Sequence, residues 1–196
     1  DHVSNTPKQV LLYRALGEKE PLFAHIPLIL GPTGAKLSKR DASVSVEEYR
    51  AQGYLAEALF NYLVRLGWSH GDTEVFTREQ LVEVSDLDQV GKKGSIFDSK
   101  KLQWLNGVYL RAKSSEELLC SLDLIDGKYR KNLQAVWPAQ ELDALLTLYK
   151  ERAVTLIELY EAVYACAVVP TSYDVSLIAK WQTAQTPAML QAFINQ

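Results

Sequence analysis

The chain has 196 residues, of which 47% are hydrophobic and 23% charged, and its formal net charge is −3. This composition excludes a disordered polymer and a uniformly basic polyanion binder, and the length allows one large domain or two small ones. The sequence has no run of 18 apolar residues and no secretory leader pattern, so we expect no membrane segment. Cys120 and Cys166 stand far apart without metal-ligand spacing, which predicts reduced core thiols and a cytoplasmic protein.

The first predicted elements are a helix and an apolar strand. The helix begins at Thr6, since the proline that follows suits a first helical turn, and ends at Gly17. The apolar run over residues 22–30 predicts a buried strand, which Pro27 restricts to a sheet edge or an irregular course. His25 lies in this run and is expected to be a hydrogen-bonded core histidine. This order is typical of the end of a doubly wound nucleotide-binding fold.

The loop after this strand carries a dense group of phosphate-binding side chains. It reads Gly-Pro-Thr-Gly-Ala over residues 31–35 and Lys-Leu-Ser-Lys-Arg over residues 36–40. Glycine lets a backbone approach a ligand closely, and the three cations and the serine hydroxyl can donate hydrogen bonds to phosphate oxygens. The alternative for these residues alone is a solvated basic loop. Residues 36–40 are called the signature loop below.

Capping residues mark the starts of several later helices. Capping boxes are expected for Ser45 with Glu48, Thr77 with Gln80 and Ser114 with Glu117, and Asp98 should cap a helix over residues 99–106. Gly107 is expected to end that helix. Trp104 and Tyr109 are expected to pack as core, because leucines surround them at helical spacing. From Ser115 onward, apolar residues recur with the period of a helix and predict a helical bundle.

Basic residues concentrate in the middle of the chain. Residues 91–131 contain nine Lys and Arg against five acids, whereas residues 140–196 contain three basic residues against six acids. This distribution fits a protein that grips a polyanion at one place. The alternative is an ordinary lysine-rich surface.

These features together resemble the bacterial-type glutamyl-tRNA synthetases, which are class I aminoacyl-tRNA synthetases. Residues 36–40 resemble the KMSKS signature of that class, in the Leu-Ser-Lys-Arg form of its glutamyl and glutaminyl branch. Residues 1–9 resemble the segment after the family's Arg-Gly-Glu, and residues 53–68 and 97–107 resemble its next domain. The matches are strong as far as residue 113 and weaker beyond it.

The resemblance implies a mainly α fold with minor β, in three parts. Residues 1–40 would end a Rossmann-type α/β catalytic domain, residues 41–113 would form a small α+β stem-contact domain, and residues 114–196 would begin a helical anticodon-binding domain. The His-x-Gly-His signature of the class does not occur in the sequence, and the chain opens at Asp1 without a Met. We therefore expect the C-terminal part of a longer enzyme, inactive on its own.

The resemblance also implies a reaction, namely ATP-dependent ligation of L-glutamate to tRNA(Glu) through glutamyl-adenylate, with Mg²⁺ accompanying ATP. Lys39 would be the principal phosphate contact, and Lys36 and Ser38 would be supporting donors. The residues expected to bind ATP are Lys39, Arg40, His2, Asp1 and Ile29. The residues expected to contact RNA phosphates are Lys92, Lys93, Lys100, Lys101 and Arg111. We expect a monomer.

Two alternatives remain open at this point. A glutaminyl-tRNA synthetase would share the signature loop, but that family continues with β-barrels, which the helical period of the tail disfavours. A non-catalytic helical interaction module would explain the tail and the missing His-x-Gly-His signature. It would give no reason for the cations of the glycine-flanked signature loop.

Overall fold

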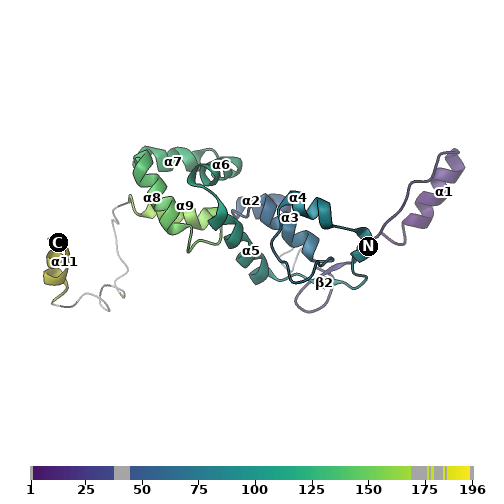
Figure 1. The fold of residues 1–196 in the computed structure, drawn as a ribbon, viewed down its shortest axis with the longest axis horizontal. Coiled ribbons are helices and arrows are strands. Elements are labelled where there is room, and N and C mark those ends of the chain that lie inside the picture. Colours follow the sequence, from purple (N-terminus) through teal and green to yellow (C-terminus); the bar gives the residue numbers. More distant parts are fainter. Residues whose placement is uncertain are drawn as a thin grey trace.

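The computed structural model describes residues 2–37, 45–168, 176, 178, 183 and 185–194. Its elements are α1 (Thr6–Leu16), β1 (Ile29–Leu30), α2 (Val46–Ala51), α3 (Ala56–Arg65), α4 (Arg78–Val84), the 3-10 turn η2 (Leu87–Gln89), β2 (Ser95–Ile96), α5 (Ser99–Ala112), α6 (Ser115–Ile125), α7 (Lys128–Val136), α8 (Ala139–Tyr149), α9 (Leu156–Ala165) and α11 (Thr186–Ile194). The fold is mainly helical with a small parallel sheet, as expected (Figure 1). The described part is elongated: α1 projects at one end, α2–α5 and the sheet lie in the middle, and α6–α9 group beyond them.

Local capping chemistry explains where the helices start. In all three predicted capping boxes the N-cap hydroxyl accepts a backbone N–H and the third helical residue bonds back to the N-cap N–H, which confirms them. Asp98 caps α5 as predicted, accepting from the backbone N–H groups of Lys100 and Lys101. Gly17 ends α1 in the left-handed conformation, with φ of 71°.

The apolar run over residues 22–30 is not a buried strand. Only Ile29 and Leu30 form β1, and the side chains of Leu22 and Ile26 are 103% and 78% exposed. A strand needs a partner for its backbone groups, and within the described residues only the last two residues of the run find one, in β2. Residues 22–28 therefore have the hydrophobic composition of a buried strand but lack the backbone hydrogen bonds to a neighbouring strand that a sheet requires.

Three residues expected in the core lie at the surface instead. His25 is exposed, and its Nε2 lies 2.8 Å from the hydroxyl of Thr6, so it ties the segment before β1 to α1. Cys120 and Cys166 are free thiols, but both are exposed. Cys120 lies on the face of α6 away from the buried Leu118 and Leu122, and Cys166 follows the last residue of α9, so neither reaches the core.

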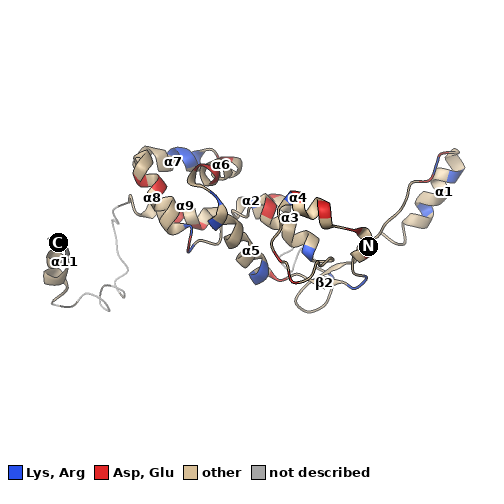
Figure 2. Ribbon diagram, in the orientation of Figure 1, with Lys and Arg blue, Asp and Glu red and all other residues tan. Residues whose placement is uncertain are grey.

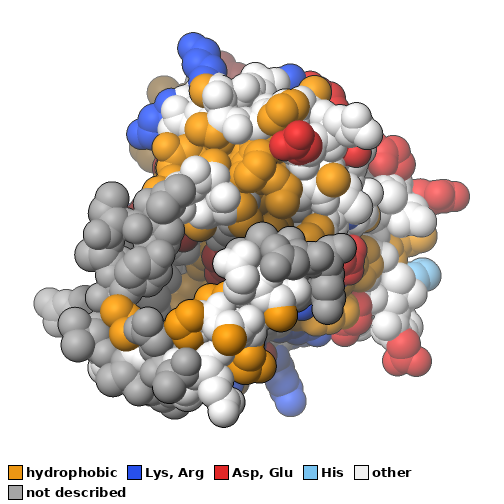
Figure 3. Space-filling view, turned by 90° about the vertical axis from the view of Figure 1, so that its left-hand side faces the viewer, with side chains coloured by type: hydrophobic (Ala, Val, Ile, Leu, Met, Phe, Trp, Pro, Cys, Tyr) orange, Lys and Arg blue, Asp and Glu red, His pale blue; other side chains and the backbone are white. Residues whose placement is uncertain are grey.

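Buried hydrophobic side chains form three clusters. The largest fills the bundle of α6–α9, as the helical periodicity predicted, and extends to Leu55 and Ala58 beside α3. The second joins α3 to α5 around Tyr62 and Leu105, and the third surrounds Trp68. Some apolar side chains stay outside: Figure 3 looks onto the bundle end and shows hydrophobic side chains gathered at the middle of that face.

α5 is longer than predicted, and Trp104 is not a core residue. The helix runs through Gly107 to Ala112, because Leu110, which follows the glycine, is fully buried in the largest cluster together with Ala58 of α3. Trp104 is 48% exposed. It lies on the face opposite to the buried Leu102, Leu105 and Asn106; the other buried residues of α5 are Gly107, on the side of Trp104, and Leu110. Tyr109 is half-buried and packs between clusters as expected.

A buried joint connects the start of α9 to the turn between α2 and α3. The N–H of Leu156 donates to the carbonyl of Gly53 at 2.9 Å. The side chain of Asn106, which is fully buried, accepts from the N–H of Leu55 at 2.8 Å and donates to the carbonyl of Val154. The joint therefore fixes the bundle onto the part of the chain that follows the signature loop.

Candidate functional site

The base of the signature loop is a closed hairpin. The N–H of Gly31 donates to the carbonyl of Ala35 at 2.8 Å, and the N–H of Leu37 donates to the carbonyl of Ile29 at 3.0 Å. Gly34 takes φ of 77°, which favours glycine, and Lys36 stands opposite Leu30 in an antiparallel bridge. The hairpin thus places its turn, residues 31–35, at the carboxyl end of β1 and holds the first two residues of the signature loop alongside the strand.

Four of the predicted site residues lie outside the described residues, namely Asp1, Ser38, Lys39 and Arg40. His2 is exposed at the start of the described chain, and its Nδ1 lies 3.4 Å from the side-chain amide of Asn5. Ile29 is half-buried in β1. Among the described residues, Ile29 is therefore the predicted ATP-binding residue that the hairpin holds in place.

β2 aligns the predicted RNA-contacting lysines with this hairpin. β1 and β2 are parallel, with Ile29 opposite Ser95 and Leu30 opposite Ile96. Gly94 permits this approach, since a Cβ there would lie 2.9 Å from a methyl of Leu30. Because parallel strands end at the same edge, residues that follow β2 lie on the side of the hairpin turn at residues 31–35, and residues that precede β2 lie on the other side.

The pairing therefore sorts the lysines into two groups. Lys92 and Lys93 are exposed and precede β2, at the edge away from the hairpin turn. Lys100 and Lys101 follow β2 in the first turn of α5, at the edge of the hairpin turn; Figure 2 shows this helical turn in blue. The sequence predicted one basic group, and the structure separates it into two. Arg111 lies near the far end of α5.

Lys101 belongs to an ion-pair network that the sequence did not suggest. Its Nζ lies 2.9 Å from Glu74, which also pairs with the guanidinium of Arg65 at 3.0 Å. The hydrogen bond from Arg65, followed by that from Lys101, lowers the pKa of the Glu74 carboxyl. Nearby, the hydroxyl of Tyr62 bonds both backbone groups of Asp98, and burial raises its pKa to about 12. Both contacts fix the start of α5 against α3.

We predict that Glu74→Gln lowers the free energy of unfolding by about 1 kcal/mol near neutral pH, since half-exposed ion pairs contribute little. A carboxyl with a lowered folded-state pKa stabilises above its ordinary pKa of 4.5 and loses that contribution as the pH falls through the folded value. The difference from the unchanged chain should therefore shrink below pH 4.5. Urea unfolding over an acid pH series measures this, with Glu83→Gln on α4 as an exposed control. A difference that persists in acid would contradict the charge-based explanation.

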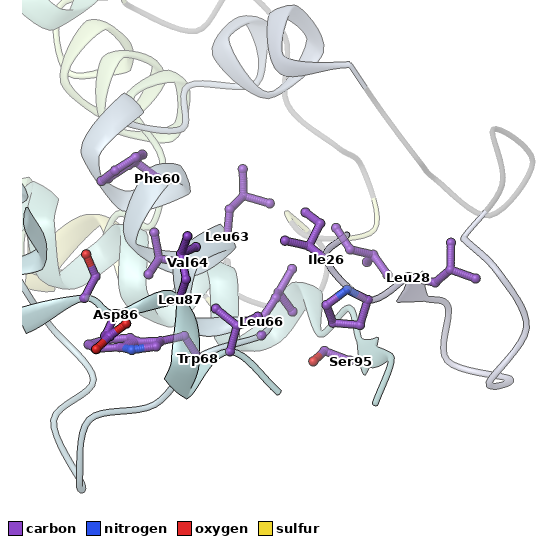
Figure 4. Close-up of a pocket in the computed structure, with 15 residues that line it drawn as sticks. Ile26, Leu28, Phe60, Leu63, Val64, Leu66, Trp68, Asp86, Leu87 and Ser95 are labelled. Atoms are coloured by element: carbon purple, nitrogen blue, oxygen red, sulfur yellow. The ribbon is translucent and has the colours of Figure 1, made fainter. Parts of the chain in front are cut away.

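An apolar cavity of about 480 Å³ lies beside the hairpin (Figure 4). Its walls come from the segment before β1, from the end of α3 and from η2, and the labelled side chains include Ile26, Leu63 and Leu87. Trp68 forms its floor, and the indole N–H of this residue is buried without a hydrogen-bond partner in the described part of the chain. The cavity is lined mainly by hydrophobic groups, with Ser85, Asp86 and Ser95 as polar exceptions and none of the predicted site lysines, so it differs in chemistry from a phosphate site.

Neither a metal-binding cluster nor a membrane-spanning helix occurs among the described residues. No group of three or more His, Cys, Asp or Glu side chains could hold a metal ion there. No helix in that part of the chain is long and apolar enough to cross a membrane.

Comparison with known proteins gives a consistent family. Residues 1–104 match the model of the catalytic domain of class I tRNA synthetases for glutamate and glutamine. The chain is 41% identical over 197 aligned residues to glutamate–tRNA ligase 1 of Aliarcobacter butzleri, covering 99% of this chain and 40% of the ligase. It is 49% identical over 166 residues to glutamate–tRNA ligase 1 of Xanthobacter autotrophicus, covering 82% of this chain and 35% of that ligase.

A solved structure agrees with these sequence matches. The crystal structure of a glutamate–tRNA ligase from Elizabethkingia meningosepticum in complex with its amino acid superposes with a TM-score of 0.75 at 30% identity. The match covers 97% of this chain and 41% of that structure. The chain thus spans about two-fifths of the length of the proteins it resembles.

Proposed function

The chain belongs to the family of class I tRNA synthetases for glutamate and glutamine, and we propose that it is part of a glutamate–tRNA ligase. The reaction joins the glutamate carboxylate to the α-phosphate of ATP, releasing pyrophosphate and leaving glutamyl-adenylate. A hydroxyl at the 3′ end of tRNA(Glu) then attacks the glutamyl carbonyl and releases AMP. The observation that carries this proposal is the hairpin at the end of β1, which leads directly into Ser38, Lys39 and Arg40.

In this proposal the signature loop acts on the phosphates of ATP. Negative charge spreads over phosphate oxygens as the carboxylate attacks, and fixed cationic donors stabilise it. Lys39 is the principal donor, supported by Lys36 and Ser38. The hydrogen-bonded hairpin supports these roles, because it holds Lys36 opposite Leu30 and so gives the loop a fixed starting point.

The remaining proposed ATP contacts come from residues before and after the hairpin turn in the sequence. We propose that Asp1, His2 and Ile29 meet the nucleoside, while Lys39 and Arg40 bind phosphates. Mg²⁺ would arrive coordinated by the phosphates of ATP, where it neutralises charge. No step needs a metal-binding cluster from this chain.

The proposed RNA contacts lie on residues 41–113, the stem-contact domain, with residues 114–196 beginning the anticodon-binding domain. Lys92 and Lys93 would bind phosphates on one side of the β1–β2 pair, and Lys100, Lys101 and Arg111 along α5. Phosphate contacts of this kind position RNA without reading its sequence. Lys101 would have to give up its ion pair with Glu74 to bind a phosphate, so its contribution to RNA affinity should be smaller than that of Lys100.

Two observations favour glutamate over glutamine. The relatives described above are named glutamate–tRNA ligases. The chain continues after α5 with the helical bundle of α6–α9, where the glutaminyl family would have β-barrels. We also propose a cytoplasmic monomer, with the two free thiols as support for a reducing compartment.

The experiment that tests the proposal is a chimera. Residues 1–196 replace the aligned segment of the Aliarcobacter butzleri ligase, and glutamylation of tRNA(Glu) is measured beside glutaminylation of tRNA(Gln). We expect glutamylation by the chimera and none by the 196-residue chain alone. A folded chimera that activates only glutamine, or neither amino acid, would contradict the proposal. Circular dichroism of the chimera serves as the folding control.

A further inference from the structure

One face of α5 carries an ordered row of residues, of which Lys100 and Trp104 are exposed, Arg111 is half-buried and Gly107 is buried beneath Arg111. Lys100, Trp104, Gly107 and Arg111 are separated by four, three and four residues, so they lie one above another along the helix. The side of α5 that carries the buried Leu102 and Leu105 is opposite to this row and packs on α3. Trp104 is the largest side chain of the row and is 48% exposed.

Gly107 leaves the space in which Arg111 lies. A Cβ at Gly107 would sit 3.0 Å from Nη1 of Arg111 and 3.6 Å from Nη2. Helical side chains lean toward the N-terminus, so the guanidinium folds back across Gly107 toward Trp104. Glycine is unfavourable inside a helix, and its presence here has this packing reason.

The cations of the row are not balanced by carboxylates. Lys100 and Arg111 form no ion pair within the described ranges, whereas their neighbours Lys101 and Lys113 pair with Glu74 and Glu57. The carboxylate of Asp98, which is close to Lys100 in sequence, is occupied by capping the helix. The row therefore presents an exposed indole between two free positive charges.

We propose that this row is an RNA-binding face, in which Trp104 stacks on an exposed base or ribose of tRNA. Lys100 and Arg111 bind phosphates on either side of it. An aromatic side chain flanked by cations is the arrangement that proteins use to hold single-stranded or looped RNA. Lys100 and Arg111 are about 16 Å apart along the helix axis, a span of a few nucleotides. The inference rests on the proposed function and adds Trp104 and Gly107 to its residues.

The first test separates stacking from charge. The 196-residue chain is titrated with a tRNA(Glu) transcript over a salt series, with the variants Trp104→Ala, Trp104→Phe and Lys100→Gln. Trp104→Ala should weaken binding about tenfold without changing the salt slope, since it removes one stacking contact and no charge. Trp104→Phe should keep most of the affinity. Lys100→Gln should lower the salt slope by about one.

The second test uses Gly107→Ala, which should not harm the fold. Alanine favours the helix and should raise the melting temperature by about 2 °C, while its Cβ displaces the guanidinium of Arg111. We expect RNA affinity to fall by a factor of about three, since the charge remains but its position changes. Higher stability with weaker binding would separate a binding role from a structural one.

The outcomes distinguish this inference from the proposed function. The control is Leu148→Ala, which removes a side chain that is 66% exposed on α8. If Trp104→Ala binds RNA as well as Leu148→Ala does, while Lys92→Gln still weakens binding, the row is not an RNA face and the proposed function stands. If the chain binds no tRNA even at low salt, this inference is overturned, even when the chimera glutamylates tRNA(Glu).

Discussion

Lys39→Ala should lower the rate of glutamylation by the chimera about 100- to 1,000-fold, the loss typical when one fixed donor to a transition-state charge is removed. The Michaelis constant for glutamate should change little, because the side chain acts on phosphate oxygens and not on the amino acid. Lys36→Ala should cost about tenfold, as a supporting donor whose backbone stays held by the hairpin. Steady-state kinetics with saturating ATP and tRNA measure both effects.

Two control variants show whether the effect is specific to the side chain of Lys39. Lys39→Arg keeps the charge but changes its shape and reach, so it should recover only part of the rate. Lys19→Ala, which removes an exposed lysine between α1 and β1, should leave the rate unchanged. ATP–pyrophosphate exchange should fall together with glutamylation, because the proposed role precedes RNA transfer. A Lys39→Ala enzyme within threefold of the parent rate would remove Lys39 from the phosphate site.

What the sequence predicted correctly depends on residues close together in the chain. A capping box needs a hydroxyl and a Glu or Gln three residues later, so Ser45, Thr77 and Ser114 could be identified without tertiary information. The bundle of α6–α9 follows from its helical periodicity.

What the sequence predicted wrongly depends on partners elsewhere in the chain. An apolar run resembles a strand whether or not a neighbouring strand pairs with it. The pattern therefore predicts a strand over residues 22–30, whereas the described residues form one only at Ile29 and Leu30. Trp104 sits among leucines in sequence, but only the packing of α5 on α3 decides which face is buried. The division of the lysines into two edges needs the register of β1 with β2, which no local pattern contains.

Gly53→Ala should lower the free energy of unfolding by about 3 kcal/mol, combining an unfavourable backbone conformation with a steric clash. Gly53 has φ of 86°, a conformation that side chains with a Cβ rarely adopt. A Cβ there would lie 2.6 Å from the backbone nitrogen of Ile157 and 2.9 Å from that of Leu156. The start of α9 must then move away from the turn before α3.

A matched glycine separates these two costs. Gly17 has φ of 71° and nothing within 4 Å of its Cβ position, so Gly17→Ala carries the conformational cost without the clash. We expect it to lose about 1 kcal/mol. Urea unfolding of both variants, followed by circular dichroism, measures the difference, which is the energetic contribution of the close approach at the joint.

Hydrogen exchange shows whether that loss is local to the joint. The N–H of Leu156 donates to the carbonyl of Gly53, so its protection should fall in Gly53→Ala, whereas amides in the centre of α5 should keep theirs relative to global unfolding. Equal losses of stability in Gly53→Ala and Gly17→Ala would mean that α9 relaxes away from the turn at little cost. The bundle would then be attached mainly through Asn106, whose side chain bridges Leu55 and Val154, and Asn106→Ala would become the more damaging change.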